Sequence, residues 1–220
     1  MILLTLDTST PHGSVALVRC QPAQCSSNQT PDQAHTVPAT PEIVFENTFH
    51  SARSHNALLF APLQEALQLL GSAKPDAIMV GTGPGSYTGI RIGIAAAHGL
   101  AAALEIPWYG WNSLATLCDD PEFVVIGDAR RGCFFHVKIV AGKLTHEPEI
   151  LPLSQLTSTL ENLNGPLVTT DESPLTPTLI SCRPRAACIA RYYNQARLNA
   201  LLIEPLYLRA PYITLPKTRP

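Results

Sequence analysis

The residues best placed to do chemistry gather in a glycine-rich segment near the middle of the chain. Residues 81–93 read GTGPGSYTGIRIG, between an apolar stretch and an alanine-rich one. Glycine allows close approach of the backbone, and a turn that opens a helix presents free amides at the positive end of the helix dipole. The segment therefore predicts a cradle for a phosphate or carboxylate, with contacts from Gly83, Gly85 and Ser86. A tight crossover in which Ser86 or Thr88 caps the helix is the alternative.

Two aspartates stand where an apolar run gives way to a polar turn. Asp7 ends one such run and Asp128 follows another, and each turn leads through a glycine into a second apolar run. The match between LTLDTSTPHGSVALV and VVIGDARRGCFFHVK indicates two related halves, although any hairpin with an aspartate in its turn would resemble it.

The histidines and cysteines do not predict a metal site. His50 and His55 lie five residues apart, which on a helix would separate them by about 140° around the axis. The six cysteines never form C-x-x-C, the spacing typical of structural zinc sites. We expect reduced thiols, no metal, and no catalytic residue from these side chains.

Apolar spacing predicts strands and helices in an α/β order. The expected strands are 2–7, 14–19, 43–48, 76–81, 107–110, 123–127, 133–140 and 166–170, and the expected helices are 54–70, 89–104, 112–118, 153–163 and 185–202. The first three strands form an antiparallel meander. Ser54 is expected to cap the first helix and Gly71 to end it, and Pro62 is expected to kink or split it.

Composition excludes several classes of protein. Hydrophobic residues make up 45% of the chain and charged residues 15%, with a net charge of -2, so the chain is globular and lacks the basic face of a protein that grips nucleic acid alone. The longest apolar stretch, 92–104, is too short to span a bilayer. The start of the chain does not resemble a signal peptide, so a cytoplasmic location is expected. Residues 20–42 are proline-rich and predict a long mobile loop.

The glycine-rich segment and its flanks resemble a known family. The pattern G-x-G-P-G-S-[FY]-T-G-x-R-I-G is the central motif of the TsaB (YeaZ) family, and residues 81–93 match it throughout, with Tyr87 in place of the commoner Phe. The resemblance extends over most of the chain, through LTLDTST…GSVAL, Arg53-x-His55, Asp128-Ala129-Arg130 and residues 204–209. The 20–42 segment is longer than the family usually has there.

The resemblance implies the actin-like ATPase fold of Hsp70 chaperones and sugar kinases, which is ribonuclease H-like, with two subdomains and a reduced second half. The subdomains would be 1–110 and 111–184, with a C-terminal helix and tail at 185–220 that packs back on the first. In ATPases of this fold an aspartate at the end of the first strand of each half faces a nucleotide. Asp7 and Asp128 match those positions, which leaves open ATP or ADP binding in the chain or at a subunit interface.

The resemblance also implies a role and partners. TsaB proteins pair with TsaD, the catalytic subunit that forms N6-threonylcarbamoyladenosine on tRNA, and the ATPase TsaE joins them. This chain would be a non-catalytic scaffold that meets tRNA only through the complex, and a homodimer is also open. The small residues of helix 89–104 would let another helix approach closely. The contact would draw on His55, Leu59, Pro62, Ala66, Leu69, Arg91, Ile94, Ala95 and His98.

Two other functions remain as alternatives. A kinase-like enzyme that binds ATP and a small molecule could use Asp7 and the glycine-rich segment. A peptidase, an older suggestion for this family, would need a base beside Ser9 or Ser86, and no histidine is placed there by the sequence.

Overall fold

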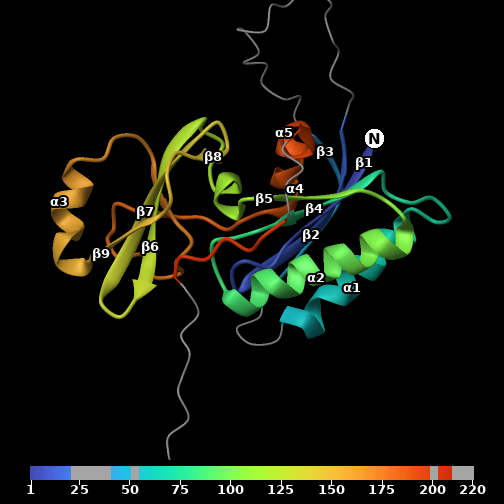
Figure 1. Ribbon diagram of the computed structural model, residues 1–220, viewed down its shortest axis with the longest axis horizontal. Coiled ribbons are helices and arrows are strands. Elements are labelled where there is room, and N and C mark those ends of the chain that lie inside the picture. Colours follow the sequence, from blue (N-terminus) through green and yellow to red (C-terminus); the bar gives the residue numbers. More distant parts are fainter. Residues whose placement is uncertain (21–40, 51–54, 199–202, 210–220) are drawn as a thin grey trace, which may run out of the picture.

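The molecule is built on two β-sheets that lie side by side (Figure 1). The computed structural model describes residues 1–20, 41–50, 55–198 and 203–209. The first sheet has the strand order β3-β2-β1-β4-β5. Its strands are β1 (Ile2–Asp7), β2 (His12–Arg19), β3 (Glu42–His50), β4 (Ala77–Gly81) and β5 (Trp108–Trp111). The meander β1–β2–β3 is antiparallel as expected, whereas β4 and β5 run parallel to β1.

Two long helices cover one face of the first sheet. These are α1 (His55–Leu69) and α2 (Tyr87–Leu104), and side chains from both interlock with alternate residues of the strands. The core beneath them contains Leu4, Leu6, Leu17, Leu59, Ile78, Val80 and Ala97. Each fully buried leucine or isoleucine contributes about 1.5–3 kcal/mol relative to exposure, so this layer fixes where α1 and α2 lie.

The opposite face of the first sheet is covered by the far end of the chain. The short helices α4 (Ala186–Ile189) and α5 (Tyr193–Leu198) pack against Leu3, Ala16, Val18 and Met79. The backbone amide of Ala186 donates to Ser14 Oγ at 2.8 Å. Both faces of a mixed sheet are thereby buried, which explains its near-continuous apolar strands.

The ends of the long helices agree with local chemistry. Ser86 caps α2 by accepting a hydrogen bond from the amide of Gly89 at 3.2 Å, which agrees with the alternative in which Ser86 or Thr88 caps the helix. Pro62 lies inside α1, which continues across it to Leu69, so the expected split does not occur. Gly71 has a φ of 60° just after α1, as a terminating glycine should. Ser54, the expected cap of α1, lies outside the described residues.

The second sheet is covered by less helix than the first. Its strand order is β11-β10-β6-β7-β8, with β9 on β7. The strands are β6 (Glu122–Arg130), β7 (Cys133–Val140), β8 (Lys143–Leu144), β9 (Glu149–Pro152), β10 (Leu167–Thr169) and β11 (Ile180–Ser181), and one short helix, α3 (Leu156–Glu161), covers an outer face. The other face buries Phe123, Val125 and Val137 against Leu114 and Leu117 from the connection between the sheets.

Several helices are shorter than the apolar spacing predicts. The expected helix at 112–118 is a single 3₁₀ turn, Ser113–Thr116, capped by Asn112. The expected helix at 153–163 begins as a 3₁₀ turn at Leu153–Gln155, and the expected helix from residue 185 is broken by another at Ala190–Tyr192. Short helices are marginally stable on propensity alone, so the packing of these apolar stretches against the rest of the molecule determines how far each helix extends.

The α/β architecture of two sheets is as expected from the order of strands and helices. The subdomain boundaries proposed from the sequence remain a prediction, and the proline-rich loop lies in the 21–40 range that is not described. Within the parts of the chain that are described, none of the helices combines the length and apolarity needed to cross a bilayer.

Candidate functional site

Asp7 is sealed inside the molecule. Its side chain is 0% exposed, and its Oδ1 accepts hydrogen bonds from the amide and hydroxyl of Ser9 at 2.8 and 2.6 Å. Its Oδ2 has no hydrogen-bond partner among the described residues. Burial raises the pKa of Asp7, and the hydroxyls of Ser9 and Ser113 counteract that rise only in part. A carboxylate in this setting is poorly placed to receive a ligand from solvent.

The glycine-rich segment is packed directly against the turn that follows β1. A Cβ atom on Gly85 would lie 2.0 Å from the carbonyl oxygen of Ser9, and one on Gly89 would lie 2.1 Å from that of Thr8. Thr8 Oγ1 also donates to the carbonyl of Gly89 at 2.7 Å. The glycines therefore allow two backbone segments to touch, which is the role of a tight crossover.

Amides of this segment are engaged within the chain. The amide of Gly83 donates to Ser113 Oγ at 3.0 Å, and that of Ser86 donates to the carbonyl of Ser9 at 2.6 Å. The amide of Ile90 donates to the carbonyl of Ser86 at 2.9 Å. These three amides already have acceptors and offer little to a phosphate, and Asp7 is buried, so these groups do not fit a nucleotide bound between them. An interfacial nucleotide remains a prediction.

Asp128 occupies the matching position in the second sheet and is more open. Its side chain is 28% exposed and pairs with Arg130 Nη1 at 2.9 Å. Its own amide donates to Asp171 Oδ2 at 2.7 Å. The structure thus keeps Asp7 and Asp128 in separate surroundings, each with partners of its own.

The residues expected at a partner interface on α1 are not all exposed. Leu59, Pro62 and Ala66 are buried in the core beneath α1 and α2, so they are not available to a partner. Leu69 is 61% exposed. His55 lies in α1, and its side chain is outside what the structure describes.

Two of the expected interface residues on α2, Arg91 and His98, face outward but are partly engaged already. Arg91 Nε donates to the Tyr207 hydroxyl at 2.8 Å, and its guanidinium lies 4.3 Å from the centre of the Tyr87 ring. That hydrogen bond and the nearby Tyr207 raise the pKa of Arg91 further above its usual range. His98 stacks on Trp108 at 5.1 Å between ring centres.

The remaining two positions on α2 differ from one another. Ala95 is exposed, whereas Ile94 is half-buried and packs on the core. The exposed side of α2 therefore combines small residues, Ala95, Gly99, Ala102 and Ala103, with the larger side chains of Arg91 and His98.

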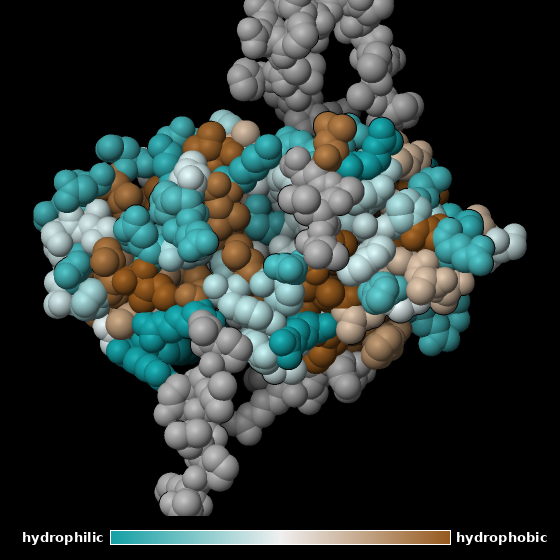
Figure 2. All heavy atoms as spheres, in the orientation of Figure 1, coloured by the Kyte–Doolittle hydropathy of each residue, from teal (hydrophilic) through white to brown (hydrophobic). Residues whose placement is uncertain are grey.

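The outer face of α1 and the start of α2 expose large apolar side chains that sequence reasoning missed. Leu58 is 41%, Phe60 58%, Leu69 61% and Tyr87 40% exposed. On α1, Leu58 and Leu69 lie on one flank of the buried stripe and Phe60 lies on the other, because Phe60 and Leu69 are about 180° apart around the helix axis. Figure 2 shows hydrophobic surface over the part of the molecule where α1 and α2 lie. We call Leu58, Phe60, Leu69, Tyr87 and Ala95 the exposed helix face. The signal was available: Leu58 and Phe60 flank Leu59, and three successive apolar residues cannot all point inward on a helix.

The exposed helix face can bury apolar surface against another helix, because small residues on α2 leave room for close approach. Apart from this face, His12, His50 and Glu172 bring three potential metal ligands within 4.8 Å of one another. Sequence reasoning compared His50 with His55 and overlooked His12.

Comparisons with known proteins find a matching family and similar proteins. The family model described as TsaD: tRNA N6-adenosine threonylcarbamoyltransferase matches residues 43–166. An uncharacterized protein of Mycobacterium tuberculosis is 29% identical over 95% of this chain and 92% of its own length. The tRNA threonylcarbamoyladenosine biosynthesis protein TsaB of Haemophilus influenzae is 27% identical over 95% of this chain and 94% of its own.

A solved structure supports the fold. An uncharacterized protein from Pseudomonas aeruginosa, described as similar to peptidase YEAZ, superposes with a TM-score of 0.63 at 24% identity, covering 94% of this chain and 99% of that one. This likeness, with the strand order β3-β2-β1-β4-β5, confirms the α/β fold that the sequence led us to expect. The actin-like ATPase type and the division into two subdomains stay predictions.

Proposed function

Since this chain belongs to the family described as TsaD, tRNA N6-adenosine threonylcarbamoyltransferase, and to its TsaB (YeaZ) members, we propose that it takes part in forming N6-threonylcarbamoyladenosine on tRNA. Its role is that of a non-catalytic partner subunit. It pairs with a TsaD-type catalytic subunit, which a TsaE-type ATPase joins, and it meets tRNA only through that complex.

The observation that carries this proposal is the exposed helix face. Phe60 and Leu69 are more than half exposed, on the two flanks of the stripe of α1 that is buried against the sheet. Several large apolar side chains exposed on the same pair of helices favour a protein partner, and aromatic residues such as Phe60 and Tyr87 are typical anchors of an interface. A second copy of the chain is the other occupant that this face would accept.

The rival functions find less support in the same geometry. A kinase-like enzyme would need Asp7 and the glycine-rich segment to be open to a nucleotide, but Asp7 is 0% exposed and the crossover is filled. A peptidase would need a base beside Ser9 or Ser86. The Ser9 hydroxyl donates to Asp7 and the Ser86 hydroxyl caps α2, so both hydroxyls already have structural roles.

The test is formation of threonylcarbamoyladenosine on tRNA by the cognate TsaD-, TsaE- and TsaC-type enzymes, with and without this chain. We expect product only when the chain is present. Equal product without it would contradict the proposal, and binding of ATP by the isolated chain would then become the question.

A matched pair of variants ties the activity to the exposed helix face. Phe60→Glu places a charge on that face, and Ile180→Glu places one on β11 at nearly the same exposure, 59% against 58%. We expect Phe60→Glu to weaken binding to the TsaD-type subunit on the order of 30-fold, the size of a hot-spot residue, and to lower product in parallel. Ile180→Glu should leave both unchanged. Equal affinity for the two variants in titration calorimetry would remove Phe60 from the interface.

A further inference from the structure

His12 and His50 form a cross-strand pair at one end of the first sheet. His12 begins β2 and His50 ends β3, and the two residues lie directly opposite each other in the antiparallel register. Residues opposite each other place their side chains on the same face, about 5 Å apart at Cβ. Their rings lie 4.6 Å apart between centres, and the Thr10 hydroxyl holds the backbone of His12 by accepting from its amide at 3.3 Å and donating to its carbonyl at 3.1 Å.

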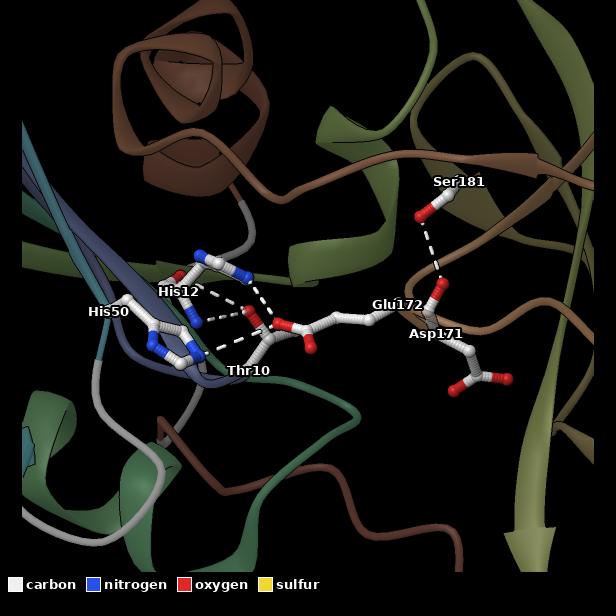
Figure 3. A network of polar contacts seen from close by, with 6 residues as sticks. All are labelled: Thr10, His12, His50, Asp171, Glu172 and Ser181. Atoms are coloured by element: carbon white, nitrogen blue, oxygen red, sulfur yellow. Dashed lines mark hydrogen bonds and ion pairs between the residues drawn. The ribbon is translucent and has the colours of Figure 1, made fainter.

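Glu172 reaches this pair from the second sheet (Figure 3). The residue before it, Asp171, is held by three hydrogen bonds. The amide of Asp171 donates to Thr169 Oγ1 at 3.1 Å, its carbonyl accepts from Ser181 Oγ at 2.9 Å, and its Oδ2 accepts from the amide of Asp128 at 2.7 Å. The carboxylate of Glu172 is therefore presented to the histidines by an anchored backbone.

Both histidines direct Nε2 toward one carboxylate oxygen. Glu172 Oε1 lies 2.6 Å from Nε2 of His12 and 3.5 Å from Nε2 of His50. In a tetrahedral zinc site with bonds of about 2.1 Å, neighbouring ligand atoms lie about 3.4 Å apart. The spacing to His50 already matches, and the spacing to His12 has to widen by less than about 1 Å, within the reach of one rotation of the Glu172 side chain.

We propose that His12, His50 and Glu172 bind one divalent transition-metal ion of the zinc class, and that this ion joins the first sheet to the second. Two imidazoles and one carboxylate are a ligand set that zinc accepts, with a water molecule in the fourth position. The side chains of His50 and Glu172 are 55% and 59% exposed, so an ion can enter from solvent and keep that water. The ion replaces the direct contact between Glu172 and His12 with three bonds that span the two halves.

The first experiment titrates Zn²⁺ into the metal-free full-length chain, with calorimetry and competition by a chromophoric chelator as readouts. We expect one ion per chain and a higher melting temperature when zinc is present, because a ligand that binds only the folded state stabilises it. Binding of Co²⁺ should give a spectrum without a thiolate charge-transfer band, since no cysteine belongs to the cluster.

Matched variants separate this site from adventitious binding. His50→Gln and Glu172→Gln change exposed side chains and should fold normally by circular dichroism. Each should weaken zinc binding at least tenfold, roughly the lower bound seen when even an outer-shell partner is lost. His136→Gln is the control, because His136 pairs with Glu149 at 3.4 Å in the second sheet and the described residues bring no third ligand to that pair. It should bind zinc as the unaltered chain does.

Any of three results with the site variants and the unaltered chain would overturn the proposal. These are zinc affinity unchanged in both His50→Gln and Glu172→Gln, a thiolate band in the cobalt spectrum, or no binding at millimolar zinc. Loss of binding in the control together with the site variants would likewise place the ion elsewhere.

Discussion

The two halves of the molecule begin with the same unit and cover it differently. In each, an antiparallel pair of strands is joined by a turn that starts at an aspartate, Asp7 opposite Ser14 in the first and Asp128 opposite Phe134 in the second. Asp7 is fully buried, whereas the side chain of Asp128 is 28% exposed. The strand and its aspartate therefore do not decide what such a turn can do.

The segments that pack on each turn account for the difference in the exposure of the two aspartates. In the first half the glycine-rich crossover and the start of α2 press on Thr8 and Ser9. In the second half the covering helix is α3, which has six residues and packs Leu156 and Leu160 on the core. The long helices of the first half expose apolar side chains on their outer surface. The second sheet buries its inner face against Leu114 and Leu117.

The largest effect should come from adding one methyl group to the crossover. Gly89→Ala would bring a Cβ to 2.1 Å from the carbonyl of Thr8, and backbone there cannot give way cheaply. We expect a loss of about 3 kcal/mol in the free energy of unfolding, measured by urea denaturation. Gly132→Ala in the second turn meets nothing within 4 Å but has a φ of 70°, so it should cost about 1 kcal/mol.

Whether Gly89→Ala lowers or raises the free energy of unfolding shows whether α2 is held against Thr8. Helix propensity alone would make Gly89→Ala favourable by about 1 kcal/mol. A stabilised variant would mean that α2 can move away from Thr8, and the glycine-rich segment would again be a candidate for binding an anion.

A smaller effect is expected from neutralising the buried carboxyl. Because the pKa of Asp7 is raised by burial, the folded state holds its proton more tightly than the unfolded state does. Stability from this group is therefore highest at acid pH and falls as pH rises from the unfolded pKa through the folded one. Asp7→Asn removes that loss and should stabilise the protein by about 1 kcal/mol at pH 7.

The pH dependence checks that assignment. The gain from Asp7→Asn should shrink as the pH of the thermal melts approaches 4. A gain that is constant with pH, or a variant less stable than the unaltered chain at pH 7, would mean that the charged form of Asp7 is favoured inside the fold.

The smallest effect is expected at the matching aspartate. Asp128→Asn loses an ion pair with Arg130, whose side chain is 84% exposed. Exposed pairs contribute about 0–1 kcal/mol, so the change in the free energy of unfolding should stay below about 0.5 kcal/mol. A loss as large as that of Gly89→Ala would show that the second turn is as tightly closed as the first.

Much of the fold could be predicted because the strands are locally encoded. The apolar runs that became β1, β4 and β6 begin and end within three residues of their predicted bounds, and Ser86 caps α2 as its position suggested. The helix near Ser113 and the helix after Arg185 were overestimated, because their apolar residues serve packing between distant segments and not one continuous helix.

The site was harder to predict for two physical reasons. Periodicity identifies an apolar stripe but not which neighbours lie beneath it, so Leu59 and Ala66 were expected at a surface when they are core residues. The cluster of His12, His50 and Glu172 depends on strand register and on a contact between the two halves. Neither can be seen from spacing, since Glu172 is 160 residues from His12 in sequence.

The closure of the first sheet by α4 bears on how the protein is made. The strands β1 and β2 leave the ribosome first, yet the amide that pairs with Ser14 belongs to Ala186, 172 residues later. Until that segment emerges, Leu3, Ala16 and Val18 lack their covering. A nascent chain halted before residue 186 would therefore expose an apolar sheet face to chaperones and proteases. Premature termination late in the message should yield a degraded product and not a folded N-terminal half.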